Sequence, residues 1–197
     1  MKISVIIPLA ENETKHQELI KFLPEELEII LSQERSRATS LNTGAKKATG
    51  EYLWFLHADS HLAANTVPKL KMAIERYPDA LLYFDLSFLN DATPLMYLNT
   101  LGVKFRSHIL GVPFGDQGLC IKKELFEQIG GFPENLAYGE DHVFVWRVRQ
   151  KGIKLYQTGA TIATSARKYK TNGWLKTTLK HQYLWVIQAW PEWRKCQ

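Results

Sequence analysis

Two acidic segments of this 197-residue chain hold the residues whose types and positions point to chemistry. Asp59 follows the apolar run 52–56, so we expect a carboxylate just beyond the carboxyl end of a strand. Open α/β sheets bind ligands at this edge, and a carboxylate there can hold a divalent cation. The simpler interpretation of position alone is that Asp59 caps the following turn while His57 fills the strand end.

The second acidic segment is the pair Glu140 and Asp141, at the expected start of a helix over 140–150. The helix macrodipole favours ionised carboxylates at this position, so the segment taken alone favours capping. A carboxylate kept ionised in a cleft also has the chemistry of a general base, which takes a proton from an acceptor hydroxyl.

A glycine-rich segment holds a third candidate. Asp116 and Gln117 lie between Gly115 and Gly118, on an expected loop. Glycines permit tight turns and close approach of the backbone to a ligand. Turn formation alone is the simpler explanation of this segment.

Basic residues mark a fourth candidate. Arg35 and Arg37 lie at the N-terminus of an expected helix over 36–50, a place suited to phosphate, and Asn42 follows on its first turns. The alternative interpretation is a solvated helix face.

The elements that position these residues alternate along the chain. Hydrophobic periodicity, caps and glycine stops predict the strands and helices. We expect strands over 3–7, 27–31 (buried), 52–56, 82–88 and 118–121, and helices over 15–22, 36–50, 66–77, 94–109, 123–128 and 140–150. This alternation predicts an α/β fold with a mostly parallel sheet flanked by helices, in one domain.

Composition is globular, with 45% hydrophobic and 23% charged residues. The net charge is +5, but the 25 basic residues are spread along the chain, so we expect no nucleic-acid partner. The N-terminal apolar run meets acidic residues at once and indicates a strand rather than a signal peptide. Cys120 and Cys196 have no metal-ligand spacing, which favours a reduced, cytoplasmic location.

The last segment, 174–197, is an expected amphipathic helix beyond a domain over 1–173. Its apolar residues recur at helical spacing, with Lys176, Lys180 and His181 between them: Leu175, Leu179, Tyr183, Val186, Trp190 and Trp193. We expect this stripe to pack on the domain, with Pro191 ending the pattern early. The alternative is peripheral contact with the inner face of an anionic membrane, where the acceptor would be linked to lipid.

Taken together and in order, four segments resemble the family 2 glycosyltransferases, which have the GT-A fold. They are VIIPLAENE, RATSLNTGAKKATGEYLWFLHADS, GDQGLCIKKELFEQIGGFPE and GEDHVFVWRVRQKG. The chain resembles more narrowly the small bacterial group of selenodomain-associated transferases, in which LHAD, GDQ and TSAR segments recur. The last is here residues 164–167, and the resemblance covers residues 2 to about 175.

The resemblance implies an inverting transfer of a sugar from a nucleotide diphosphate, with a UDP-sugar favoured, to an unknown acceptor. Asp59 would hold a divalent cation, Mn²⁺ or Mg²⁺, and Asp141 would be the base with Glu140 beside it. Asp116 and Gln117 would line the sugar and acceptor side. The remaining donor-side positions implied are Pro8, Ala10, Glu11, Arg37, Asn42, His57 and Ala58.

One departure from the family pattern concerns the nucleotide base. Family members usually carry an Asp-rich loop after the second strand, whereas here Ser32-Gln33-Glu34 leads directly to Arg35. A non-catalytic or degenerate sugar-nucleotide-binding module is therefore the alternative function. A nucleotidyltransferase also places carboxylates at a sheet edge, but the first loop, PLAENETK, lacks the glycine-rich pattern usual there.

Overall fold

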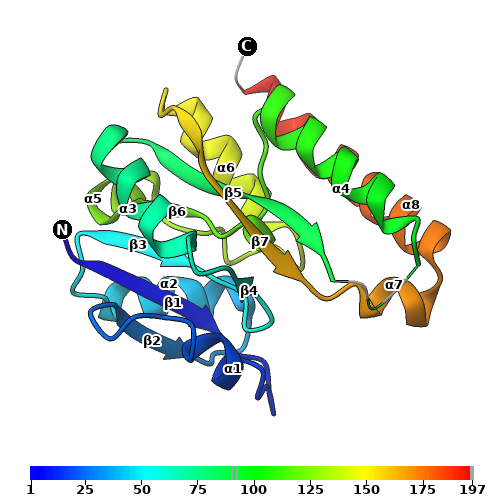
Figure 1. The fold of residues 1–197 in the computed structure, drawn as a ribbon. Helices are drawn as coiled ribbons and strands as arrows, with labels where there is room; N and C mark the ends of the chain where they lie inside the picture. Colours follow the sequence, from blue (N-terminus) through cyan, green and yellow to red (C-terminus); the bar gives the residue numbers. More distant parts are fainter. Residues whose placement is uncertain (90, 92, 196–197) are drawn as a thin grey trace.

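The computed structural model describes residues 1–89, 91 and 93–195. A seven-stranded mixed sheet has the order β2-β1-β3-β6-β5-β7-β4 (Figure 1). The strands are β1 (Ile3–Pro8), β2 (Glu28–Ser32), β3 (Tyr52–Phe55), β4 (His61–Leu62), β5 (Leu81–Phe88), β6 (Cys120–Lys122) and β7 (Leu155–Thr164). Strand β1 pairs in parallel with β2 and β3, and β5 pairs in parallel with β7, whereas β6 and β4 run antiparallel to their neighbours.

The connecting segments are mostly helical. The helices are α1 (His16–Ile20), α2 (Arg37–Lys47), α3 (Thr66–Arg76), α4 (Met96–Lys104), α5 (Lys123–Ile129), α6 (Glu140–Gln150), α7 (Arg167–Asn172) and α8 (Trp174–Arg194). A π-helical turn, η1 (Phe105–Ile109), continues α4, and a 3₁₀ turn, η2 (Gly115–Gln117), precedes β6. The expected α/β fold of sheet and flanking helices is confirmed.

Side-chain alternation in β1 explains the three layers. Ile3, Val5 and Ile7 pack in one hydrophobic cluster with α1 and α3. Ile6 points to the other face, into a second cluster with α2, α5 and α6. Since successive strand residues face opposite sides, a continuous apolar run is the pattern of a strand covered on both faces.

Helix α2 lies unusually close to the sheet. Ser36 caps it by accepting a hydrogen bond from the Thr39 N–H, as expected for a helix that begins here. A Cβ atom placed on Gly44 would lie 2.5 Å from Cγ2 of Ile6, a stiff β-branched side chain. Glycine at this position therefore sets the distance between α2 and β1.

Two strands differ from the expectations. Strand β2 lies at the sheet edge, and Leu31 is exposed, so the prediction of a buried second strand is wrong. The longest strand, β7, was not expected. Gly159 has a φ of +82° within it, and the β5–β7 register shifts nearby, so the apolar alternation is interrupted at a bulge.

Helix α8 also differs from its expectation. It continues through Pro191 to Arg194, and the stripe expected to pack on the domain is exposed along its length. The opposite face makes the contacts: Gln188 donates to the Tyr138 carbonyl at 2.7 Å, and Gln150 of α6 donates to the Glu192 carbonyl at 3.2 Å.

Of the two cysteines, Cys120 alone lies within the described residues. Cys120 is buried in β6, where burial raises the pKa of its thiol, and Cys196 lies outside the described residues.

Candidate active site

The tip of β3 divides the candidate site in two. The segment after the strand turns back, with the Ser60 N–H donating to the His57 carbonyl at 3.1 Å. Ala58 is buried in the core, whereas His57 and Asp59 on either side of it are partly exposed. The turn therefore presents these two side chains to different surroundings.

On the His57 side, Arg37 connects the two acidic segments. Its guanidinium donates to Nε2 of His57, and its Nε lies 3.3 Å from Oε1 of Glu140. Glu140 is buried at the start of α6, next to Asp141. We call Arg37, His57, Glu140 and Asp141 the Arg37 cluster.

Asp141 is held in its ionised form within this cluster. Burial raises the pKa of its carboxyl, but the charge of Arg37 and hydrogen bonds from backbone N–H groups outweigh burial, so the pKa lies below its usual value. The Gly115 N–H donates to Oδ2 at 2.7 Å and the His142 N–H to Oδ1 at 2.8 Å. The carboxylate is thus charged and fixed in orientation near neutral pH.

The turn η2 brings Asp116 next to the cluster. Burial raises the pKa of Asp116 to about 6, and the charge of Asp141 adds to this, while Arg106 and Arg37 lower it. Its Oδ1 is buried without a hydrogen-bond partner. A buried carboxyl oxygen without a partner is costly, which makes Asp116 a candidate for contact with a substrate group.

Gln117, in contrast, is fully buried. Its amide donates to the Phe84 carbonyl at 2.9 Å, and its oxygen accepts from the Phe114 N–H at 3.1 Å and from Arg106 at 3.3 Å. These contacts hold η2 against the sheet. The sugar-and-acceptor role of Gln117 stays a prediction.

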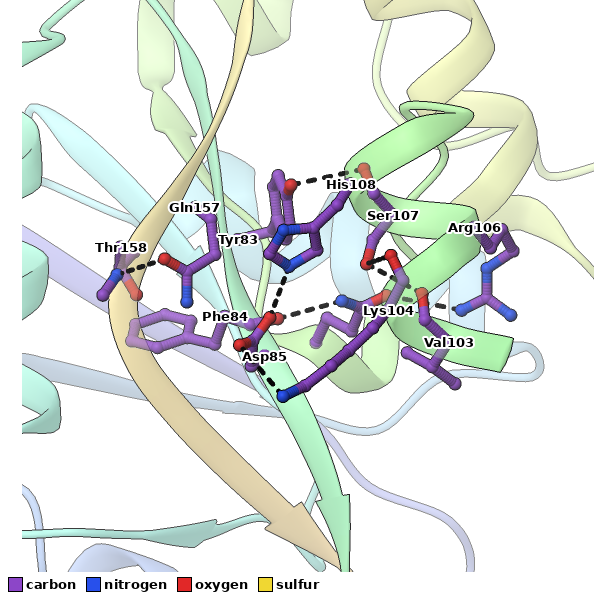
Figure 2. A network of polar contacts seen from close by, with 12 residues as sticks. Tyr83, Phe84, Asp85, Val103, Lys104, Arg106, Ser107, His108, Gln157 and Thr158 are labelled. Carbon is purple, nitrogen blue, oxygen red and sulfur yellow. Dashed lines mark hydrogen bonds and ion pairs between the residues drawn. The ribbon is translucent and has the colours of Figure 1, made fainter. Parts of the chain in front are cut away.

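Arg106 is a residue that sequence reasoning missed. It lies in η1, is 9% exposed, and stacks its guanidinium 3.4 Å from the ring centre of Phe114. The turn itself is attached to β5. Figure 2 shows Tyr83 donating to the Ser107 carbonyl at 3.2 Å and His108 Nε2 lying 2.7 Å from Oδ1 of Asp85. A lone arginine within an expected helix gives no sequence signal of this placement.

On the other side of the β3 tip, Asp59 opens into a pocket of about 350 Å³. We call this the Asp59 pocket. Lys15 lies 3.9 Å from the Asp59 carboxylate, and Arg167 lines the same pocket. Asp91 and Ser165 also line it, and they hydrogen-bond to each other. In the sequence, only the TSAR segment indicated that Ser165 and Arg167 belong to the site, and no sequence feature indicated Lys15.

The Asp59 pocket fits a cation that arrives with a phosphate ligand. The Asp59 side chain is 32% exposed and has Lys15 as its ion-pair partner. Within the described parts of the chain, no group of three or more His, Cys, Asp or Glu residues is placed to hold a metal. Glu18 and Asp91 also line the pocket, but Glu18 is paired with Lys21 and Asp91 with Ser165. Asp59, between Lys15 and Arg167, is therefore the carboxylate that suits Mg²⁺ or Mn²⁺ bound mainly by diphosphate oxygens.

The residues expected at the N-terminal edge lie at the same end of the sheet. Ile6 pairs with Phe55, so Pro8, two residues on, reaches the level of His57. Ala10 and Glu11 follow on an exposed loop. No described contact tests their role.

Asn42 is engaged elsewhere. Its amide donates to the Phe132 carbonyl at 2.9 Å and to Glu134 at 2.8 Å, and its oxygen accepts from the Phe132 N–H. These bonds tie α2 to the loop after α5. Proximity of Asn42 to the donor stays a prediction, and the contacts support a structural role.

Comparison with known proteins gives one family and one set of similar folds. Residues 13–132, more than half of the chain, match the model of a family described as glycosyl transferase family 2. No curated protein matches the chain.

The solved structures found include TarS of S. aureus, at 17% identity and a TM-score of 0.64, over 87% of this chain and 38% of that one. TarS 1–349 in complex with UDP-GlcNAc has 16% identity and a TM-score of 0.58, over 84% of this chain and 58% of that one. The complex of TarS 1–349 with UDP has 16% identity and a TM-score of 0.59, over 84% and 61%. This chain thus spans less than two thirds of each, and the likeness shows a shared fold.

Proposed function

This chain belongs to glycosyl transferase family 2, and from that membership we propose that it moves a sugar from a nucleotide diphosphate to an acceptor hydroxyl with inversion. One observation carries the proposal. Arg37 contacts both His57, at the tip of β3, and Glu140, beside Asp141. The two acidic segments, more than 80 residues apart, therefore meet at one guanidinium.

Asp141 is the proposed base. Its lowered pKa keeps it ionised, and the hydrogen bonds from Gly115 and His142 fix its orientation. It takes the proton of the acceptor hydroxyl while that oxygen forms a bond to the anomeric carbon. The bond from this carbon to the diphosphate oxygen breaks, and the electron pair leaves with the diphosphate. Attack opposite the leaving group inverts the anomeric configuration.

The Asp59 pocket is the proposed place of the diphosphate. Lys15 and Arg167 offer positive charge to its oxygens, beside the Asp59 carboxylate. A divalent cation bound to Asp59 and the diphosphate would offset the charge that grows on the leaving group. The side chains of the pocket thus bind the donor, whereas the Arg37 cluster activates the acceptor.

We propose UDP-sugars as the donors. The TarS structures in complex with UDP-GlcNAc and UDP support this, since they share the fold. Within the family we propose the selenodomain-associated group. Its three recurring segments all border the site here: the LHAD tip of β3, the GDQ turn beside Asp141, and the TSAR wall of the Asp59 pocket.

The test is a panel of UDP-, GDP-, CDP- and ADP-sugars incubated with the protein and Mn²⁺ or Mg²⁺. Slow hydrolysis, measured as nucleoside diphosphate release, reports turnover without a known acceptor, and thermal shift reports binding. We expect stabilisation by UDP-sugars and metal-dependent release that Asp141→Asn abolishes. The exposed Glu75→Gln on α3 is the matched control and should leave release unchanged.

The missing Asp-rich loop favours the second candidate, a binding module without turnover. Ser32 is buried at the end of β2, and the Glu34 N–H donates to Ser40, so this segment passes directly into α2. Stabilisation by a sugar nucleotide with no diphosphate release in any metal would support the module and contradict the enzyme.

A further inference from the structure

Exposed apolar side chains are concentrated on two segments of the molecule. Of the nineteen large apolar side chains exposed among the described residues, fourteen lie in 95–110 and 175–193. Scattered exposed apolar residues are normal, whereas a contiguous set marks a contact surface. These segments are α4 with η1, and α8.

On α8 the exposed residues form one stripe. At about 100° per residue, the six residues from Leu175 to Trp193 identified in the sequence fall within an arc of roughly 80°. All six are between 41% and 65% exposed. Exposed Lys176, Lys180 and Arg194 lie along one flank of this arc. An apolar stripe with tryptophans and a basic flank is the pattern of a helix lying in a membrane interface.

A second exposed apolar stripe lies on α4 and η1. Tyr97, Leu101, Phe105 and Ile109 recur every four residues, and each is at least 45% exposed. Helix α8 lies behind α4 in the view of Figure 1, and the two meet where Trp174 donates to Asn99 at 2.7 Å. Since Asn99 is two residues from both Tyr97 and Leu101, the α4 stripe faces away from this contact. We call the stripe on α8 the apolar face.

The charge near the apolar face indicates what kind of surface it binds. Residues 151–197 contain nine Lys or Arg and one acid, Glu192. That acid is paired with Lys195 at 2.6 Å. A surface rich in positive charge, with Trp and Tyr rings between apolar side chains, complements anionic headgroups over acyl chains. Among the residues described, no helix is long and apolar enough to span a bilayer. We propose that the apolar face lies on the surface of an anionic membrane.

The same elements reach the catalytic centre from behind this face. Arg106 of η1 contacts Gln117 beside Asp116, and Gln188 of α8 donates to the Tyr138 carbonyl, two residues before Glu140. Docking of α8 would therefore hold the Arg37 cluster close behind the helix that lies on the membrane. If the proposed transfer holds, the acceptor is a hydroxyl carried by a lipid. The docking itself does not depend on the transfer.

The test is flotation of the full chain with two kinds of vesicle, one of phosphatidylcholine alone and one that also contains phosphatidylglycerol. We expect flotation with the anionic vesicles and much less with the neutral ones. Added salt should weaken binding without abolishing it, because the apolar contribution is not screened. Absence of flotation with anionic vesicles overturns the proposal, whatever the enzymatic result.

Variants locate the contact. Trp190→Ser with Trp193→Ser should reduce the vesicle affinity about tenfold or more, since each ring removes apolar surface from water when it enters the interface. Met72→Ser, an exposed apolar residue of α3, is the control and should bind as the unaltered chain does. Thermal unfolding identifies a variant that fails to fold. In that case the flotation of the unaltered chain with anionic and neutral vesicles decides whether the proposal holds.

Two results contradict the proposal directly. Equal flotation of the double tryptophan variant places the contact elsewhere. A concentration-dependent dimer in sedimentation, lost in the same variant and with no flotation of the unaltered chain, would show that a second copy covers the apolar face. Diphosphate release in solution is measured separately, so a failed docking and a failed transferase give different results.

Discussion

The two sides of the β3 tip hold their charged groups in different ways. In the Arg37 cluster, Glu140 is buried and paired, and Asp141 accepts two backbone hydrogen bonds. In the Asp59 pocket, the carboxylate is a third exposed, and its ion pair with Lys15 is long, at 3.9 Å. Both sides contain acidic residues, but the protein supplies close hydrogen-bond and ion-pair partners for the carboxylates of the Arg37 cluster and, among the described residues, only one distant partner for Asp59.

This difference separates two tasks. A group that must be ready for each acceptor is best fixed in advance by the protein, because preorganised dipoles need no rearrangement during reaction. A group that must bind and release a charged donor benefits from incomplete pairing, because the ligand supplies the missing partner. The proposed function accordingly puts the chemistry on one side and donor binding on the other, and four variants test this division.

The largest effect is expected for Asp141→Asn. Loss of the base should lower turnover about 10²- to 10⁴-fold, the range for general-base catalysis. Donor affinity should remain nearly unchanged, because the Asp59 pocket is intact. Diphosphate release and the thermal shift by the donor, measured on the same preparation, check this. A parallel loss of donor binding would erase the distinction between the two sides.

Asp59→Asn should act on binding first. We expect donor affinity to fall about tenfold or more and the dependence on Mn²⁺ or Mg²⁺ to disappear, since the carboxylate that would hold the cation is gone. Titration of the donor with and without metal measures both. Retained metal dependence with an unchanged affinity would show that Asp59 only shapes the turn, as its position alone allows.

Arg37→Gln should shift the pH profile. The charge of Arg37 lowers the pKa of Asp141, so its removal raises that pKa, and the ionised base is then lost at a higher pH. The acid limb of the rate profile should move upward, with a loss of about tenfold near neutral pH. Release rates across a pH series test this. An acid limb at the same pH as in the unaltered protein would show that Arg37 does not influence the pKa of the base.

The smallest effect is expected for Asp116→Asn, and on stability. The folded-state pKa of Asp116, about 6, lies above the usual 3.8, so its protonated form is favoured by folding. The wild-type free energy of unfolding therefore falls as pH rises through this window and stays lower above it. The amide should stabilise the protein by about 1–3 kcal/mol at pH 7.5 and by close to zero at pH 4. Thermal unfolding at the two pH values measures this. A constant difference would contradict the assigned titration.

Local patterns were enough for the first half of the sheet. The apolar run of β1, the cap at Ser36 and the run before Asp59 are all short-range signals, and the structure has the elements they predict. The proposed roles of Asp59 and Asp141 came from the order of the motifs shared with the family, because no local pattern separates a capping carboxylate from a functional one.

What the sequence did not reveal depends on distant contacts. Arg106 and Arg167 join the site through η1 and the end of β7, and side-chain periodicity carries no information on such meetings. The bulge at Gly159 hid β7 itself. The exposure of the α8 stripe was missed for a related reason: an amphipathic pattern shows that one face is apolar, not which face meets the protein.

The close approach of α2 to β1 has an evolutionary consequence. Arg37 begins the helix that Gly44 holds against Ile6, so the position of that cation depends on a pair of residues distant from any substrate. A residue larger than glycine at position 44 is tolerable only where position 6 carries a side chain smaller than isoleucine. Among relatives, substitutions at these two positions should therefore occur together. Relatives in which only one of the two changes should not carry arginine at position 37.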